Sequence, residues 1–102
     1  MPLSPKRLVN ALQYSRDGFV HAYNHEAAFK DECILALILI PVSLFFKLTA
    51  FEHFCLIAVI LLVMTVELLN SGIEAAIDRI SSEEHELSKQ AKDMGSAAVT
   101  LS

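Results

Sequence analysis

Residues 54–80 read FCLIAVILLVMTVELLNSGIEAAIDRI, an apolar segment that acquires acidic and amide side chains toward its end. Asn70, Glu74 and Asp78 follow Glu67 at offsets of 3, 7 and 11 residues. Since a helix turns about 100° per residue, these four side chains fall within about 80° of one another and form one polar stripe. Ionisable groups are unfavourable inside a hydrocarbon span, so such a stripe indicates a functional site rather than a simple anchor.

The composition is typical of a small membrane protein. The chain has 102 residues, which allows one domain at most, and 54% of them are hydrophobic. The formal net charge is −4 and no basic patch offsets it, which argues against nucleic acid as a partner. The first apolar run begins at Cys33, after about thirty mostly polar residues, so we expect no signal peptide.

Residues 4–30 predict an amphipathic helix that lies on the membrane surface. Ser4 suits the N-cap, and Pro5 suits the first helical position, where its missing N–H does no harm. Apolar side chains recur at spacings of four and seven residues, and charged side chains take the other faces. A soluble helix packed on a core is the alternative, but the strongly apolar segments that follow favour the membrane surface.

Two segments are apolar enough to cross a bilayer. Residues 33–51, CILALILIPVSLFFKLTAF, rise about 28 Å as a helix, barely enough for a hydrocarbon core about 30 Å thick. Glu52 and His53 are predicted to form a turn, and the second span covers residues 54–80, long enough to protrude from the bilayer. A further helix is predicted over residues 83–102. Its end, GSAAVTLS, turns apolar again, as if a third span began there and was truncated.

Lysine and arginine residues predict the orientation in the membrane. Most of them precede the first span or follow the second, whereas Lys47 alone lies near the connecting turn. By the positive-inside rule, both ends of the chain are therefore expected in the cytoplasm and the turn outside. The basic residues on the expected cytoplasmic side are Lys6, Arg7, Arg16, Lys30, Arg79, Lys89 and Lys92.

The depth of the acidic stripe suggests its chemistry. Counted from Phe54, Glu67 lies about 20 Å along its helix, or about 10 Å below the cytoplasmic surface. A charged carboxylate is unfavourable at that depth, which suits a general base acting on a hydroxyl group among the lipid headgroups. Glu74 lies nearer the water, where it can hold Mg²⁺ together with substrate phosphates and another acid. Glu26 ends the surface helix at a similar depth, and Glu32 follows six residues later.

Lys92 and Asp93 belong to the last predicted helix, on the cytoplasmic side. A lysine there can meet a polyphosphate as a point charge. Metal-holding acids, a base and a phosphate-binding lysine together indicate phosphoryl transfer. The sequence contains no G-x-x-x-x-G-K-[ST] or G-x-G-x-x-G pattern and only three glycines, so ATP would bind without a P-loop or a kinase glycine loop.

Three stretches, NHEAAFKDE, VELLNSGIEAAIDRI and EEHELSKQAKDMGSAAV, carry a family resemblance that covers residues 5–100. They closely resemble the small prokaryotic diacylglycerol kinases, integral membrane enzymes unrelated to soluble kinases. The resemblance implies an all-α membrane protein: an amphipathic surface helix and three transmembrane helices, of which two are complete here, assembled as a homotrimer with shared active sites. It also implies transfer of the γ-phosphoryl group of Mg-ATP to diacylglycerol, which gives phosphatidic acid at the bacterial inner membrane.

The resemblance further implies roles for individual residues. Glu67 matches the catalytic base, and Glu26 and Glu74 match the metal ligands, with Glu32 as a further candidate. The HELS and KDMGSAA motifs favour diacylglycerol over undecaprenol as the lipid substrate. An undecaprenol kinase is the alternative assignment within the resemblance. Contacts with the nucleotide or the lipid are implied for Arg7, Tyr14, Ser15, Asn70, Asp78, His85, Glu86, Lys92, Asp93 and Ser96.

Two interpretations of other classes stay open on the residues alone. A small membrane transporter would use Glu67 as the counter-ion for a proton or cation, which explains neither the continuation of the stripe to Asp78 nor the segment with Lys92. A non-catalytic membrane protein or remnant would bury Glu67 and Glu74 without a role, which is unfavourable by about 3 kcal/mol for each acid. ATP-dependent transfer of labelled phosphate to diacylglycerol distinguishes both from a kinase.

Overall fold

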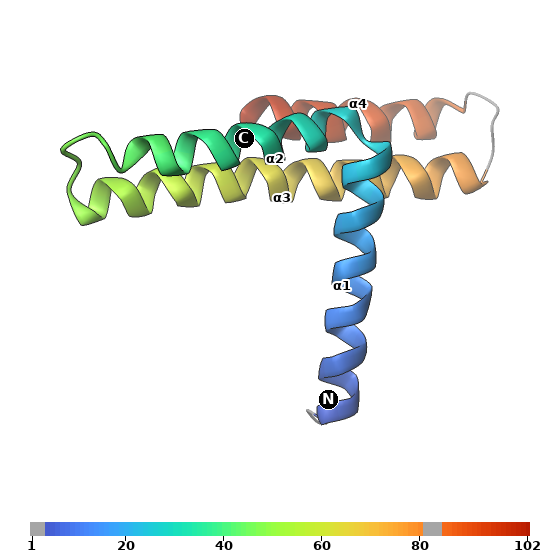
Figure 1. Ribbon diagram of the computed structural model, residues 1–102. Coiled ribbons are helices and arrows are strands. Elements are labelled where there is room, and N and C mark those ends of the chain that lie inside the picture. Colours follow the sequence, from blue (N-terminus) through green and yellow to red (C-terminus); the bar gives the residue numbers. More distant parts are fainter. Residues whose placement is uncertain (1–3, 81–84) are drawn as a thin grey trace.

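The computed structural model describes residues 4–80 and 85–102, and the regular structure in those ranges is α-helical. Figure 1 shows α2 and α4 lying along opposite halves of the long helix α3, while α1 projects away from this layer like the stem of a T. The all-α class predicted from the sequence is confirmed. The four described helices are α1 (Pro5–His25), α2 (Ala27–Ser43), α3 (Ala50–Ile80) and α4 (Glu86–Leu101).

Helix α1 begins as the sequence predicts and ends earlier. The Ser4 hydroxyl oxygen accepts a hydrogen bond from the backbone N–H of Arg7 at 3.2 Å, with a proline in the first turn. Instead of one helix over residues 4–30, the structure has a break at Glu26, whose backbone is extended with φ −112° and ψ 104°. The chain turns sharply there into α2 (Figure 1).

A small apolar core explains why the helix breaks at Glu26. Within the described ranges, the buried apolar side chains are those of Ala22 and Phe29, 4% and 1% exposed. The Phe29 ring stacks on the Phe19 ring with the centroids 6.4 Å apart. In one straight helix, residues ten apart would be separated by about 15 Å along the axis, so this contact needs the corner.

Helix α2 is apolar on all sides from Cys33 onward, as a membrane span requires, but it begins closer to the N-terminus than the predicted span of residues 33–51. Its 17 residues rise about 26 Å, slightly less than a hydrocarbon core. Pro41 removes one helical hydrogen bond in the last turn, and the helix ends at Ser43. The Ser43 hydroxyl donates to the carbonyl oxygen of Ile40 at 2.6 Å, which closes this end.

A reciprocal capping contact fixes the start of α3. The Glu52 N–H donates to Thr49 Oγ1 at 3.1 Å, and the Thr49 N–H donates to Glu52 Oε1 at 3.2 Å. This is a capping box, so the helix begins at Ala50. Glu52 and His53, predicted to form a turn, therefore lie in the first turn of α3.

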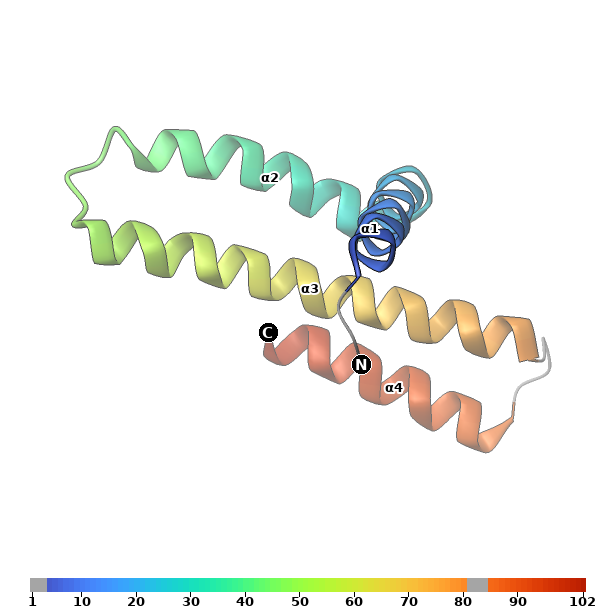
Figure 2. The same cartoon turned by 90° about the horizontal axis from the view of Figure 1, so that it is seen from below.

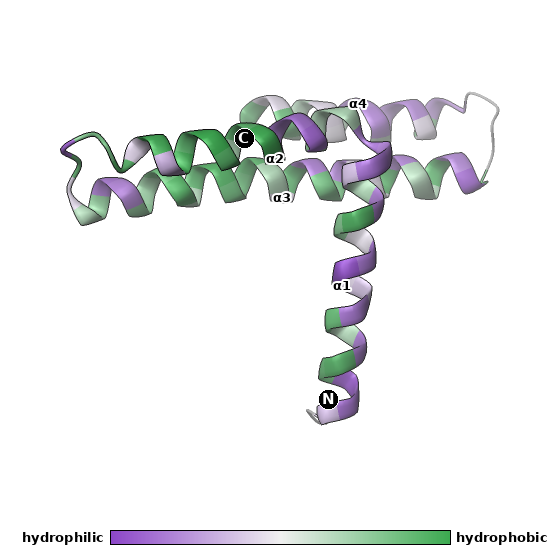
Figure 3. Cartoon of the chain, in the orientation of Figure 1, coloured by the Kyte–Doolittle hydropathy of each residue, from purple (hydrophilic) through white to green (hydrophobic). Residues whose placement is uncertain are grey.

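Among the described helices, α3 is the one that is long and apolar enough to cross a membrane. Its 31 residues rise about 46 Å, which exceeds a hydrocarbon core about 30 Å thick. Figure 3 shows hydrophobic residues over α2 and the adjoining part of α3, and hydrophilic residues near the α1–α2 corner and along the first half of α4. The polar groups thus gather toward one end of the layer.

Helix α4 runs antiparallel to the C-terminal half of α3, as Figure 2 shows from a second direction. His85 is its N-cap, and His85 Nδ1 accepts a hydrogen bond from the Leu87 N–H at 3.1 Å. The first two residues of the helix predicted over 83–102 lie outside the described residues. The contact between α3 and α4 is the most extensive between any two of the described helices.

Candidate active site

Four carboxylates gather where the α1–α2 corner meets α3. Glu67 interacts electrostatically with Glu74 and Glu26, and Glu32 interacts with Glu67. Glu67 and Glu74 belong to α3, Glu26 sits at the corner, and Glu32 lies in the second turn of α2. All four residues are half-buried. The fold thus brings together, from three segments, the acids that the sequence singled out.

The backbone at Glu26 leaves its carboxylate available for other partners. This residue ends α1 and begins α2, and its own N–H donates to the Ala22 carbonyl oxygen at 2.8 Å. Its side chain makes no capping hydrogen bond to α2. Glu26 and Ser15 also border a cavity of about 400 Å³ between α1 and α3, with Ser71 on the opposite wall. Ser15 therefore borders the same cavity as Glu26.

Glu32 has a buried oxygen that lacks a partner. Glu32 Oε2 makes no hydrogen bond to any residue of the described chain. A buried polar atom without a partner is unfavourable by about 1–3 kcal/mol. Glu32 also lines an apolar cavity of about 170 Å³ between α2 and α3, together with Leu35, Val59 and Met64.

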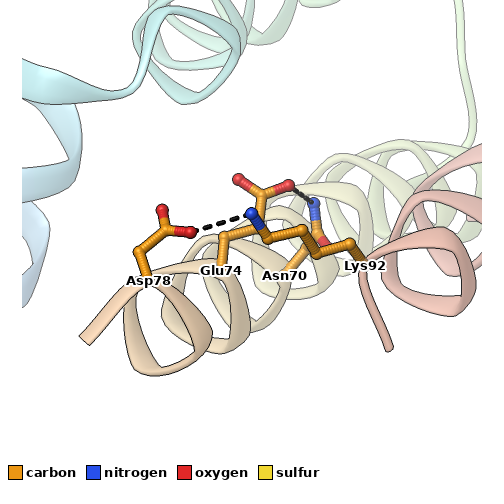
Figure 4. Close-up of polar contacts among 4 residues, drawn as sticks. All are labelled: Asn70, Glu74, Asp78 and Lys92. Carbon is orange, nitrogen blue, oxygen red and sulfur yellow. Dashed lines mark hydrogen bonds and ion pairs between the residues drawn. The ribbon is translucent and has the colours of Figure 1, made fainter. Parts of the chain in front are cut away.

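The middle of the predicted polar stripe is held by a hydrogen bond. Asn70 is 9% exposed and is the buried residue of α3. Its Nδ2 donates to Glu74 Oε1 at 3.3 Å, one turn further along the same face (Figure 4). The amide therefore orients the Glu74 carboxylate. On its other side, Asn70 Oδ1 has no hydrogen-bond partner within residues 4–80 and 85–102 and lies against Gly95 of α4.

An ion pair joins α4 to the end of the stripe. Lys92 Nζ lies 2.8 Å from Asp78 Oδ1, as Figure 4 shows. Within α4, Lys89 Nζ lies 2.7 Å from Asp93 Oδ2. Lys92 and Asp93, which are predicted to lie on the last helix, thus both form ion pairs. The pair of Lys92 links that helix to the acidic face of α3.

Other implied contact residues do not all reach the acids in this chain. Arg7 and Tyr14 lie in the N-terminal half of α1, which projects away from the other helices (Figure 1). His85 and Glu86 form the first turn of α4 and its cap. Ser96 has an exposed side chain on the same helix. Within one chain, the structure therefore does not bring Arg7 and Tyr14 to the acidic cluster.

One residue at this site was not singled out from the sequence. Gly95 is the buried residue of α4, and a Cβ atom built on it would collide with the Asn70 amide. The available signal was a glycine inside an otherwise regular helical pattern. Such a glycine lowers helix stability by about 1 kcal/mol and can mark a close approach.

The acidic cluster suits a magnesium nucleotide. Among residues 4–80 and 85–102, no three His, Cys, Asp or Glu side chains converge closely enough to hold an ion by themselves. Magnesium in nucleotide sites is usually held by one or two carboxylates together with phosphate oxygens and waters. Glu26 and Glu74 each interact electrostatically with Glu67, so two carboxylates from separate segments are available here for such an ion.

The acids are grouped on and beside the apolar helix α3, next to a helix whose lysines form ion pairs with aspartates. This arrangement has the chemistry of a membrane phosphotransferase. Residues 13–102 match the family model described as prokaryotic diacylglycerol kinase. The chain belongs to this prokaryotic family of membrane lipid kinases. The family and the class of enzyme predicted from the three sequence stretches are confirmed.

Several similar proteins bear the name diacylglycerol kinase. The protein of Pseudomonas aeruginosa is 53% identical over 93 residues, which cover 91% of this chain and 76% of that protein. The protein of Haemophilus influenzae is 49% identical over 94 residues, which cover 92% of this chain and 80% of that protein. The protein of Escherichia coli K12 is 46% identical over 95 residues, which cover 93% of this chain and 78% of that protein. This similarity extends over both the acidic stripe and α4.

Proposed function

We propose that this diacylglycerol kinase uses Glu67 as its general base. The hydroxyl oxygen of diacylglycerol attacks the γ-phosphorus of ATP, and the bond between that phosphorus and the bridging oxygen of the ADP group breaks. The hydroxyl proton passes to a carboxylate oxygen of Glu67. The products are phosphatidic acid and ADP, so atoms and charge balance without a further reactant.

The grouping of Glu67 with Glu26, Glu32 and Glu74 carries this proposal. Carboxylates repel one another, so four of them persist together where a cation or a transferred proton belongs to the function. They come from three segments that the α1–α2 corner brings to one place. A simple membrane anchor has no use for this arrangement.

Glu26 and Glu74 are the proposed ligands of Mg²⁺, with Glu32 as a further candidate. When it is bound with ATP, Mg²⁺ neutralises charge that develops on the transferred phosphoryl group. Asn70 orients Glu74 through the hydrogen bond from its amide. Lys92 supplies positive charge for the polyphosphate, and its ion pair with Asp78 sets where that charge lies.

We further propose that the complete site combines more than one copy of the chain, in a homotrimer. Arg7 and Tyr14 lie on the half of α1 that projects from its own bundle. A neighbouring copy would bring them beside the acids of another subunit. The exposed apolar side chains of α2 and α3 suit contact with lipid tails or with neighbouring helices.

The distribution of basic residues supports an orientation in the bacterial inner membrane with the N-terminus in the cytoplasm. Lys47 is the one basic residue of the loop between α2 and α3. The other lysines and arginines belong to α1, to the start of α2, to the end of α3 and to α4. The positive-inside rule then places the acidic cluster at the cytoplasmic surface, where ATP is available.

The direct test is phosphate transfer by the purified chain in mixed micelles. The chain is incubated with γ-labelled ATP and Mg²⁺, and with diacylglycerol, undecaprenol or no lipid. Labelled phosphatidic acid is the expected product, formed faster than undecaprenyl phosphate at equal lipid content. Undecaprenyl phosphate as the main product would overturn the assignment of the lipid. No labelled lipid from either substrate would overturn the proposed catalysis by this chain.

A further inference from the structure

Helices α3 and α4 are in tight contact at one pair of residues, Asn70 and Gly95. Asn70 is the buried residue of α3, and Gly95 is the buried residue of α4. The three atoms nearest to a Cβ atom built on Gly95 all belong to the Asn70 side chain: Oδ1, Cγ and Cβ. The amide oxygen of Asn70 thus occupies the space that a side chain at position 95 would need.

This requirement for glycine is specific to position 95. A Cβ atom built on Gly72, in the same helix as Asn70, has nothing within 4 Å, and the same holds for Gly18 in α1. Gly95 has no backbone conformation that only glycine adopts, because none of the described glycines has a positive φ. Since alanine would favour the helix by about 1 kcal/mol, the contact with Asn70 is the reason for glycine here.

The planar amide of Asn70 connects the contact at Gly95 to the acidic cluster. The amide of Asn70 presents its oxygen to Gly95 and its nitrogen to Glu74. The bond from Nδ2 to Glu74 Oε1 is already long at 3.3 Å, and at a separation of about 3.6 Å the two groups would no longer be hydrogen-bonded. A methyl group at position 95 would displace the oxygen, turn the amide and draw the nitrogen away from the carboxylate.

We propose that Gly95 is a positioning residue for phosphoryl transfer. By leaving space for the Asn70 amide, it fixes the orientation of Glu74, and through it the affinity of the site for the divalent cation of the nucleotide. This inference rests on the proposed role of Glu74 as a metal ligand. Groups that orient a metal ligand typically change metal affinity by 10- to 100-fold when they are removed.

The test compares Gly95→Ala with Gly72→Ala, the same chemical change at a glycine without a neighbour. Two quantities are measured: binding of Mn²⁺ by electron paramagnetic resonance, with the β,γ-imido analogue of ATP present, and the Mg²⁺ concentration that half-saturates lipid phosphorylation. Gly95→Ala is expected to weaken both by about tenfold. Gly72→Ala is expected to change both by less than about twofold. Because Gly72 borders the cavity between α1 and α3, the turnover number of Gly72→Ala is not used as a reference for that of Gly95→Ala.

A double variant tests whether Gly95 acts through Asn70. Asn70→Ala alone is expected to weaken cation binding by about tenfold. Gly95→Ala with Asn70→Ala is expected to show the same loss of about tenfold, because the second change finds no amide to displace. A loss of about 100-fold in the double variant would mean that the two residues act independently, and it would overturn the inference.

The remaining outcomes are also decisive. If Gly95→Ala binds Mn²⁺ as Gly72→Ala does, while Asn70→Ala binds it weakly, the positioning role is refuted. A further outcome is that Gly95→Ala fails to fold while the double variant folds and binds Mn²⁺ with the affinity of Asn70→Ala. In that case the effect of Gly95→Ala comes from its collision with the Asn70 side chain, and the inference stands. If both fail to fold, Gly95 serves helix packing alone. Glu74→Ala tests the underlying assignment separately, since unchanged Mn²⁺ binding there would remove Glu74 as a ligand whatever Gly95 does.

Discussion

Lys92 of α4 and Asp78 of α3 form an ion pair across the interface between the two helices, with Nζ 2.8 Å from Oδ1. The two side chains are 42% and 65% exposed. Ion pairs with this exposure contribute about 0–1 kcal/mol to stability, so this pair adds little to the cohesion of the helices. Its effect is to fix where the positive charge lies relative to the acidic face of α3.

Asp78→Asn is therefore expected to affect the nucleotide more than the fold. We expect the apparent KM for ATP to rise about fivefold, equivalent to about 1 kcal/mol, while the unfolding temperature in detergent barely changes. Steady-state kinetics and thermal unfolding measure the two effects. Asp17→Asn on the exposed surface of α1 is the control for loss of a negative charge. An unchanged KM together with a lower unfolding temperature would make the pair purely structural.

Glu67→Gln is expected to abolish turnover. Glutamine keeps the size of the side chain but cannot take up a proton from the lipid hydroxyl, so kcat should fall by at least about 100-fold. Affinity for the β,γ-imido analogue of ATP should change by less than about twofold, because the proposed nucleotide contacts lie elsewhere. Measuring kcat and nucleotide binding on the same preparation separates the two quantities. A retained kcat would remove Glu67 as the base.

Phe29→Ala is expected to destabilise the corner between α1 and α2. Phe29 is 1% exposed and stacks on Phe19, and removing a buried phenylalanine typically lowers stability by about 3–5 kcal/mol. Phe45→Ala, at a residue 89% exposed in the α2–α3 loop, is the matched control and should have little effect. Chemical unfolding in detergent, followed by circular dichroism, compares the two variants. Equal effects would show that the corner does not depend on this core.

The sequence was most informative where a feature depends on neighbours along one helix. The spacing of Asn70 and Glu74 predicted a shared face, and the hydrogen bond between them lies on that face. The N-cap at Ser4 was equally local and was predicted correctly. By contrast, the break at Glu26 depends on a stack between rings ten residues apart, which no helical periodicity encodes. The fit of Gly95 against Asn70 depends in the same way on the packing of two helices.

One misplaced boundary was nevertheless encoded locally. Residues 49–52 read TAFE, which has the spacing of a capping box. The apolar run extends to residue 51, so hydropathy alone predicts the turn at Glu52 and His53. The side chain and backbone of Glu52 pair with those of Thr49, so the helix begins earlier. The spacing of capping residues is therefore a better indicator of the start of this helix than hydropathy is.

Thr49→Ala is expected to destabilise the chain by about 1 kcal/mol while kcat changes by less than about twofold. It removes the acceptor of the Glu52 N–H at the end of α3 remote from the acidic cluster. Thr65→Ala is the control, because the Thr65 hydroxyl donates to the Leu61 carbonyl oxygen inside the helix and satisfies no terminal N–H. Thermal unfolding in detergent compares the variants. Equal stability of the Thr49 variant and the unmodified chain would show that the capping box is dispensable.

Sharing of active sites between subunits is tested by mixing two defective chains. Arg7→Gln and Glu67→Gln are each expected to be inactive alone, since each lacks one group of every site. In mixed homotrimers at equal amounts, a site formed by α1 of one subunit and α3 of its neighbour is intact with a probability of one in four, so about a quarter of the turnover should return. Glu67→Gln mixed with Glu67→Ala is the control, because both changes affect the same residue of α3 and no mixed site can recover its carboxylate. If the Arg7 mixture recovers no more than this control, Arg7 and Glu67 do not meet across subunits.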